Sequence, residues 1–241
     1  MMELIASLFD IVDPKILQQM QIIDKEFLFA TWETLYSLVL QVVFSYAIGL
    51  PLGVLLVTGD KGGIHPLPAP LMKITNTVIN LLRSVPFLIL MIIALPLSKL
   101  LVGTKIGTMA TVPPMVIAAF PLVARMVESS LREVNHGVVE AAQSMGASTW
   151  QIVTKVLLPE SLPSLISGGA ITMTTILGYG AMAGIIGGGG LGQMAITYGY
   201  YNTKYLIMWA AVIGLIILVQ IFQSVGGRMA VKCDKRLRSK S

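Results

Sequence analysis

The sequence predicts an all-α integral membrane protein with five transmembrane helices. Only 12% of its 241 residues are charged and 55% are hydrophobic, whereas a soluble domain has about 25% charged residues. Five apolar stretches reach the roughly 20 residues that a helix needs to cross a bilayer. Six of the 17 lysines and arginines gather between Arg228 and Lys240 instead of covering a folded face, which argues against a nucleic-acid partner.

The N-terminal segment, residues 1–30, is expected to be retained and to lie outside the cytoplasm. It has no basic start, and Asp10 interrupts its apolar stretch, so no removable signal is predicted. Asp13 and Pro14 are residue types that begin helices. The apolar residues that follow at helical spacing are Ile16, Leu17, Met20, Ile23 and Phe27. They favour a short amphipathic helix on the membrane surface, with a mobile arm as the alternative.

The membrane domain is expected over residues 31–227. Its five predicted spans are Leu35–Val57, Ile74–Leu97, Ile106–Val127, Leu162–Ile186 and Leu206–Val225. The second span has two interpretations, because its strongest apolar run starts only at Ser84 and the part before it is alternatively an interfacial helix. Arg83 is then either buried among helices, which is costly and typical of function, or a boundary arginine that reaches the headgroups.

The distribution of basic residues predicts the orientation, because cytoplasmic loops carry an excess of lysine and arginine. With the C-terminus inside, the cytoplasmic set is Lys61, Lys73, Arg132, Lys155 and the basic tail 228–241. The set left outside is Lys15, Lys25, Lys99, Lys105 and Lys204. The sequence therefore favours an external N-terminus and a cytoplasmic C-terminus.

The loop between the third and fourth spans, residues 129–161, is longer than the others and predicted to be cytoplasmic. Ala141 and Ala142 favour a helix, Gly146 is expected to end it, and Thr149 is expected to cap a second helix. Pro159 and Pro163 are expected to mark the turn into the fourth span. The product would be two short helices that meet at a bend, a shape suited to a groove on another protein.

This loop resembles the signature of bacterial ABC-importer permeases, which reads E-A-A, three residues, Gly, nine residues, Ile, one residue, Leu-Pro. The matching residues are Glu140, Ala141, Ala142, Gly146, Leu158 and Pro159, with Val156 in place of the usual isoleucine. The resemblance implies a type I ABC-importer permease fold. It also implies that the loop is a coupling helix that fits a cleft in an ATPase subunit.

Four further segments resemble the methionine-import permeases in particular. They are Trp32–Thr34, Arg83–Phe87, Ala124–Glu128 and Gly189–Gln193. The resemblance implies import of L-methionine, and of D-methionine as well, into the cytoplasm across the bacterial plasma membrane. The implied partners are two ATPase subunits, an extracytoplasmic methionine-binding lipoprotein, membrane lipid and a second copy of the chain. Five helices are also few to enclose a path, which independently favours a homodimer.

The chain is not expected to be an enzyme or to hold a cofactor. It lacks the G-x-x-x-x-G-K-[ST] phosphate-binding motif, so ATP hydrolysis must occur on another chain. Gly187, Gly189 and Gly192 match G-x-G-x-x-G, but no strand is predicted before them; a tight outer turn packed closely against a neighbour is expected instead. A single cysteine and two isolated histidines predict no metal site.

Candidate substrate-path residues lie in the fourth span: Met173, Thr174, Thr175 and Tyr179. A soft thioether ligand would suit such a lining, although ordinary helix packing explains these residues as well. Arg125 and Glu128, three residues apart, are expected to form a local ion pair near the inner surface.

Two alternatives to a methionine permease stay open at this point. One is an ABC permease for another small amino acid. The other is an ion-coupled secondary transporter, which would carry internal repeats and acidic groups within the membrane. Neither feature is apparent, because Glu128 lies at the end of a span and the five spans do not divide into matching halves. A membrane enzyme would need a catalytic cluster, and none is visible.

Overall fold

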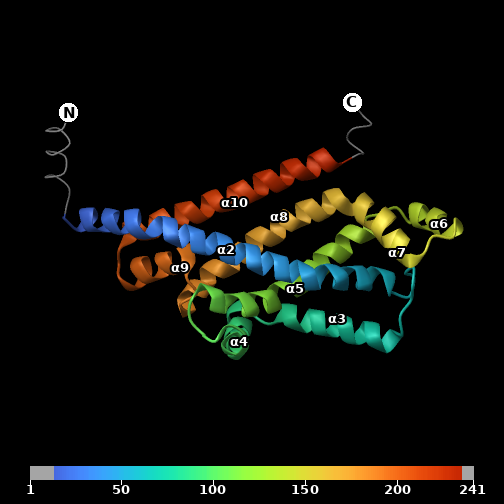
Figure 1. Cartoon of the computed structure of the whole chain (residues 1–241), viewed down its shortest axis with the longest axis horizontal. Coiled ribbons are helices and arrows are strands. Elements are labelled where there is room, and N and C mark those ends of the chain that lie inside the picture. The colour runs from blue at the N-terminus through green and yellow to red at the C-terminus, as the bar shows by residue number, and fades with distance from the viewer. Residues whose placement is uncertain (1–13, 235–241) are drawn as a thin grey trace.

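The computed structural model describes residues 14–234, and every regular element in that range is helical. The long helices are α2 (Pro14–Thr58), α3 (Ala69–Ser84), α4 (Phe87–Val102), α5 (Thr108–Arg132), α8 (Leu158–Ala183) and α10 (Tyr205–Cys233). The short ones are α6 (His136–Ser144), α7 (Thr149–Ile152), η1 (Val153–Leu157), η2 (Gly184–Ile186), α9 (Gly190–Met194) and η3 (Ala195–Tyr201). Most long helices run side by side along the longest axis of the molecule (Figure 1). The predicted all-α class is confirmed.

The first span and the segment before it form one helix. Pro14 begins α2, where its missing N–H costs nothing, and the helix continues for 45 residues to Thr58. At 1.5 Å per residue it is about 68 Å long, more than twice the hydrocarbon thickness of a bilayer. The expectation of a separate short surface helix is therefore wrong from Pro14 onward, and the proposed cap Asp13 lies outside the described residues.

The second predicted span is broken. Val85 has extended backbone angles, φ −79° and ψ 130°, because Pro86 disfavours helical geometry in the residue before it. The chain bends by 110° between α3 and α4, so α3 lies along the bundle while α4 is seen almost end-on (Figure 1). A continuous Ile74–Leu97 helix is wrong. Among residues 14–234, four helices are long and apolar enough to cross a membrane, or five if the bent pair counts as one span.

Arg83 lies in the last turn of α3 and is exposed. Burial of this arginine among helices of its own chain, the first of the two interpretations, is therefore wrong.

The centre of the bundle is the pair formed by α2 and α5. A Cβ atom on Gly49 or Gly53 would lie 2.6 Å from the Cβ of Val123 or Val127, respectively, so only glycine allows this approach. Small residues bring membrane helices together in this way and increase their van der Waals contact. The two helices are consequently packed backbone against side chain over two turns.

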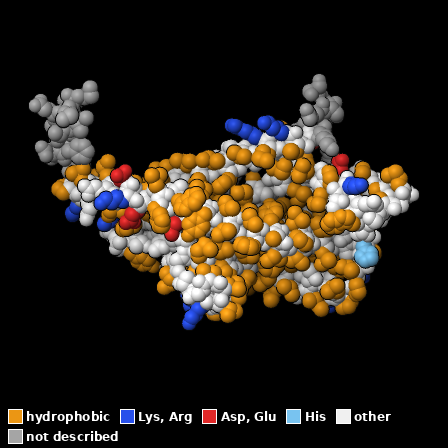
Figure 2. Space-filling view, in the orientation of Figure 1, with side chains coloured by type: hydrophobic (Ala, Val, Ile, Leu, Met, Phe, Trp, Pro, Cys, Tyr) orange, Lys and Arg blue, Asp and Glu red, His pale blue; other side chains and the backbone are white. Residues whose placement is uncertain are grey.

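The two largest apolar clusters divide the core of residues 14–234 along the bundle, beside a smaller one against α3. One, called the outer cluster after the side on which its end of the bundle is expected to lie, gathers Met115, Ile176, Leu191 and Ile207. The inner cluster gathers Val123, Val127, Leu131, Ile152 and Leu157. Hydrophobic side chains also cover the middle of the visible surface, with the charged ones toward its ends and margins (Figure 2), the pattern expected of a protein surrounded by lipid.

Candidate functional site

The loop after α5 folds into two short helices joined by a tight bend; residues His136–Ile152 are called the knuckle below. Asn135 caps α6, because its Oδ1 accepts the Gly137 N–H at 2.9 Å. At the other end Gly146 has φ +77°, a left-handed conformation that glycine adopts without steric cost. The prediction that Gly146 ends the first helix is confirmed.

The second helix of the knuckle begins one residue earlier than expected. Ser148 is the cap: its Oγ accepts the Gln151 N–H at 3.3 Å, and its own N–H donates to Gln151 Oε1 at 2.9 Å. This reciprocal pair is a capping box. The assignment of Thr149 as the cap is wrong, because a longer glutamine three residues after Ser148 can return the hydrogen bond.

The knuckle continues directly into the fourth span. Residues Thr149–Ile186 form one run of 38 helical residues, which includes the short π-helical turn η1. Pro159 lies in the first turn of α8, and Pro163 one turn later. The predicted turn at these prolines is wrong, because the wider η1 turn and the helix start accommodate them. A displacement of the knuckle is therefore delivered straight to α8.

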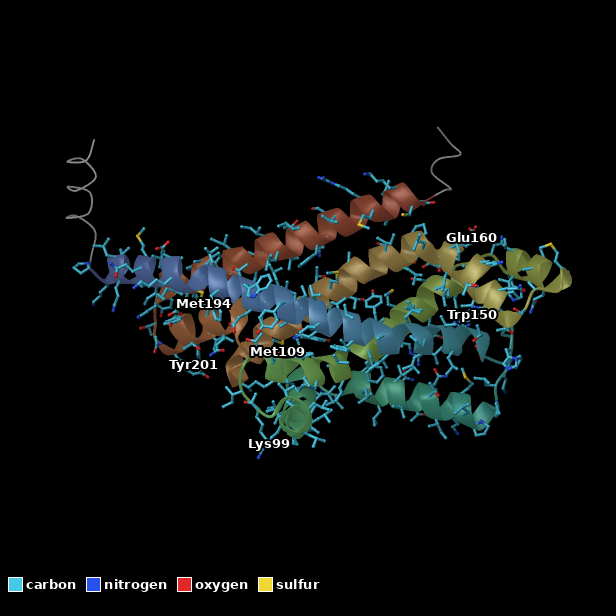
Figure 3. All side chains as sticks on the ribbon, in the orientation of Figure 1. Lys99, Met109, Trp150, Glu160, Met194 and Tyr201 are labelled. Carbon is cyan, nitrogen blue, oxygen red and sulfur yellow. The ribbon has the colours of Figure 1, made fainter. Side chains whose placement is uncertain are left out.

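Two large apolar side chains flank the bend and face outward. Met145 is 81% exposed and Trp150 is 74% exposed. Figure 3 places Trp150 at the opposite end of the molecule from Met194 and Tyr201. Exposed tryptophans of this kind are enriched among the residues that dominate binding energy at protein interfaces. Sequence reasoning missed both residues, although a tryptophan among polar residues beside a helix-ending glycine was the available signal.

The signature residues divide between the two sides of the knuckle. Ala142 is buried and packs into the inner cluster, whereas Glu140 and Ala141 are exposed. Glu140 Oε1 lies 3.1 Å from His136 Nδ1. Leu158 is half-buried and Pro159 is exposed. Both lie at the start of α8, separated from the bend by α7 and η1. The motif thus combines residues that present the knuckle with residues that anchor it.

A chain of polar contacts, the inner polar network, ties the end of α5 that leads into the knuckle to α3. Arg125 pairs with Glu128 at 2.6 Å, as predicted, and also donates to Asn76 at 2.8 Å and Asn80 at 2.9 Å. Glu128 accepts from Arg132 at 3.0 Å. These contacts fix α3 to the inner end of α5.

Arg132 extends the network to the loop after α2. Its Nη2 donates to Asp60 Oδ2 at 2.9 Å. This hydrogen bond, together with one from the backbone N–H of Lys61, holds the pKa of Asp60 below its ordinary value. The carboxylate therefore stays ionised at neutral pH and keeps the loop attached to α5.

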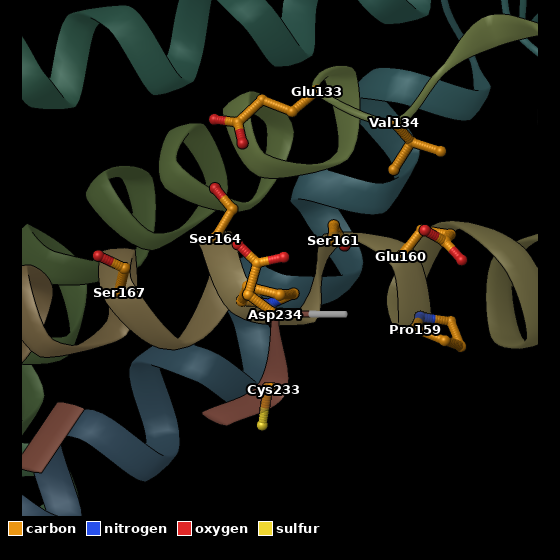
Figure 4. Close-up of a pocket in the computed structure, with 10 residues that line it drawn as sticks. Glu133, Val134, Pro159, Glu160, Ser161, Ser164, Ser167, Cys233 and Asp234 are labelled. Atoms are coloured by element: carbon orange, nitrogen blue, oxygen red, sulfur yellow. The ribbon is translucent and has the colours of Figure 1, made fainter. Parts of the chain in front are cut away.

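Two cavities lie at this end of the molecule, and the first of them borders the knuckle. One, of about 400 Å³, lies between the loop after α2 and α6 and is lined by Asp60, Arg132 and Gln143. The other, of about 280 Å³, is lined by Glu133, Glu160 and Asp234 from the ends of three long helices (Figure 4). Such unfilled volume leaves the knuckle room to move relative to the bundle.

At the opposite end, a glutamate holds three elements together. Glu33 accepts a hydrogen bond from Thr108 Oγ1 at 2.7 Å and from the Gly190 N–H at 2.9 Å. The neighbouring Thr34 Oγ1 accepts the Leu191 N–H at 2.9 Å. The turn before α9 is tight, with positive φ at Gly187, Gly189 and Gly190. The expected tight turn with close packing is confirmed, and it joins segments 157 residues apart; its position on the outer side stays a prediction.

The four candidate path residues are half-buried on α8. The hydroxyls of Thr174 and Thr175 both donate to the Ile171 carbonyl at 2.9 Å. The Tyr179 ring stacks on Phe87 of α4, with centroids 4.2 Å apart and planes 6° from parallel. These contacts are those of helix packing, and the role of Met173, Thr174, Thr175 and Tyr179 in a path stays a prediction.

Comparison with known proteins agrees with this geometry. The family model for the binding-protein-dependent transport system inner membrane component matches residues 49–238. The "Probable D-methionine transport system permease protein MetI" of Vibrio cholerae is 49% identical over 207 residues, which are 86% of this chain and 92% of that protein. The methionine import system permease protein MetP of Bacillus subtilis is 44% identical over 86% of this chain and 93% of its own.

Solved structures extend the likeness to three dimensions. The inward-facing MetNI methionine ABC transporter matches with a TM-score of 0.84 at 40% identity, over 87% of this chain and 96% of that one. An amino acid ABC transporter crystallised with histidines matches with a TM-score of 0.71 at 17% identity, over 88% of this chain and 96% of its own. The second likeness shows a shared fold only.

Proposed function

Because this chain belongs to the family of binding-protein-dependent transport system inner membrane components, we propose that it is the permease subunit of an ATP-driven methionine importer. The substrate follows from relatives at 49% and 44% identity that are named for methionine transport. ATP hydrolysis belongs to a separate subunit. The working importer contains two copies of this chain, two ATPase subunits and an extracytoplasmic methionine-binding protein.

The observation that carries the coupling role is the knuckle. Met145 and Trp150 project beside the bend between α6 and α7, and the N-termini of these two helices are capped by Asn135 and Ser148, respectively. A protruding apolar pair on a rigid base fits a cleft on a soluble partner, because its burial provides binding energy without reordering the backbone. The ATPase subunit is the partner that the family requires at this place.

Force is transmitted from the knuckle to the bundle by two routes. The first is covalent, because α7, η1 and α8 are one helical run. The second is the packing of Ile152 and Leu157 against Val127 and Leu131 of α5. Movement of two knuckles by closing ATPase subunits would tilt α8 and α5 in both copies. Such rigid-body motion is the common way to alternate access between two faces.

The orientation proposed is an external N-terminus with the knuckle and C-terminus in the cytoplasm. It rests on the basic loop residues noted above and on the need for the ATPase to meet the knuckle where ATP is present. The Glu33 cluster then lies at the external end, where it joins α2, α5 and α9.

The decisive experiment is uptake of labelled L-methionine into proteoliposomes. The vesicles contain this chain and its ATPase, with binding protein outside and ATP inside. Uptake should require internal ATP and should be lost with Glu140→Lys, which reverses a charge on the exposed face of α6. Uptake driven by an ion gradient without the ATPase would refute the class. Uptake of another amino acid but not methionine would correct the substrate alone.

A further inference from the structure

α3 carries a polar face that the rest of residues 14–234 leaves exposed, with Asn80 at its edge also accepting from Arg125. Its exposed polar residues are Lys73, Thr77, Asn80, Arg83 and Ser84. With 3.6 residues per turn they fall within a sector of about 120°. They form a stripe along the last 12 residues of the helix, about 18 Å at 1.5 Å per residue. The stripe is called the α3 polar face below.

The other two sectors of α3 are apolar. Met72 and Ile79 are buried in a cluster with Leu56 and Ala124 of α2 and α5. Leu71, Ile74, Val78 and Leu81 are exposed, by 47%, 61%, 46% and 65% respectively. The helix therefore has one face for the bundle, one apolar face suited to lipid and one polar face suited to neither.

The hydrocarbon of the bilayer cannot cover the α3 polar face. α3 packs along α5, which is itself a candidate span, and only the combined α3 and α4 segment passes as a further span. Ionisable groups at membrane depth carry a large penalty unless they meet protein or a water-filled cavity. Water within the assembly, or a second copy of the chain, is therefore the expected neighbour of Thr77 and Arg83, whereas Lys73 lies toward the cytoplasmic end of α3.

Arg83 differs from the other arginines near α3. Arg125 pairs with Glu128, and Arg132 pairs with both Glu128 and Asp60. Within residues 14–234, the guanidinium group of Arg83 makes no hydrogen bond or ion pair. It stands at the 110° bend, beside the residues that bring Phe87 onto Tyr179 of α8.

We propose that the α3 polar face lines the substrate path and that Arg83 binds the carboxylate of the amino acid in transit. A planar guanidinium matches a carboxylate with two parallel hydrogen bonds. Thr77, Asn80 and Ser84 supply neutral groups along which the zwitterion passes. In a homodimer two such faces meet at the path. The inference rests on the proposed function, because methionine is the ligand that it assigns to the path.

Thiol labelling tests whether the face is wet, independently of transport. Cys233 is the only cysteine, so Cys233→Ser gives a cysteine-free chain. Thr77→Cys and Ser84→Cys are compared with Val78→Cys and Leu81→Cys, which the single chain also leaves exposed. In the reconstituted complex a membrane-impermeant charged thiol reagent should label the first pair at least about tenfold faster, because an apolar setting raises a thiol pKa.

Two labelling results would overturn the inference. Equal labelling of the two pairs means that the polar face is not set apart from the lipid face. Unlabelled Thr77→Cys that instead forms a disulfide between two copies means that the face is a dry contact in the dimer.

Substitution of Arg83 tests the carboxylate contact. Arg83→Gln should lower ATP-driven L-methionine uptake at least about tenfold, the effect of losing a charge-assisted hydrogen bond, and Arg83→Lys should restore part of it. The matched control is Arg228→Gln, which removes an exposed arginine from the end of α10. Copurification with the ATPase verifies assembly of each variant. Normal uptake by Arg83→Gln would overturn the carboxylate assignment.

The proposed function and the role of the α3 polar face are refuted by different results. If the unmodified complex does not take up methionine at all, the proposed function fails, while the labelling pattern still decides whether the α3 polar face is wet. If methionine uptake is normal and Thr77→Cys labels no faster than Val78→Cys, the inference fails and the importer stands.

Discussion

Removal of the Trp150 side chain should uncouple the chain from its ATPase without unfolding it. The side chain is 74% exposed, so roughly 150 Å² of its 150–250 Å² is free to be buried by a partner. At about 25 cal/mol per Å², and with the part that alanine retains subtracted, Trp150→Ala should weaken binding by about 3 kcal/mol. This corresponds to roughly 100-fold in Kd.

The assay is equilibrium binding of the detergent-solubilised chain to its isolated ATPase. The control is Trp209→Ala, since Trp209 is 59% exposed on α10, far from the knuckle, and should leave Kd unchanged. Thermal unfolding of Trp150→Ala should match the parent within about 0.5 kcal/mol, because a surface side chain is lost. A Kd within threefold of the parent would refute the assignment of Trp150 as an anchor.

Three further predictions follow from the same contacts. Gly146→Ala should lower the free energy of unfolding by about 1 kcal/mol in a melting experiment, because φ is +77°; Gly227→Ala, equally free of neighbours but without positive φ, should not. At pH values above 3.8, the ordinary pKa of aspartate, Asp60→Asn should lower the melting temperature. This difference between variant and parent should vanish as the pH falls through the lowered pKa of Asp60, because protonation of the parent removes the same ion pair. A pH-independent difference would contradict that assignment. Glu33→Gln leaves one of the two donors to this side chain without an oxygen acceptor and should lower the free energy of unfolding in urea by about 1.5–3 kcal/mol. An unchanged free energy of unfolding would contradict the Glu33 cluster.

Local chemistry was predictable where one residue type has few alternatives. Gly146 ends a helix because little else accepts its backbone angles, and Arg125 reaches Glu128 because they stand one turn apart. The family resemblance and the all-α class were predicted correctly for a related reason. Long apolar segments and a signature with fixed spacing can be recognised in the sequence without knowledge of the tertiary packing.

The errors came from judging boundaries by hydropathy. The hydropathy of the residues on both sides of Pro86 is high, so they were predicted as one span, although the chain bends there by 110°. Conversely, the polar residues before the first span and the prolines after the knuckle looked like breaks. The helix continues at Thr31 and Thr34, whose hydroxyls bond to carbonyls four residues earlier, and at Pro159, which starts α8. Tertiary partners decide such cases, and a single sequence does not show them.

The unbroken run from Thr149 to Ile186 makes the two faces of the membrane mechanically dependent on each other. Its 38 residues span about 57 Å at 1.5 Å per residue. Near its midpoint Gly168 presses on Met126 of α5, where a Cβ would lie 2.6 Å from the Met126 Cγ, and Ala170 presses on Gly226 of α10. A helix held by its neighbours at its midpoint pivots about that point, so its two ends move in opposite directions. A pull of a few ångströms at Trp150 would then appear, reversed in sign, at the glycine turn on the other side, and one face would close as the other opens.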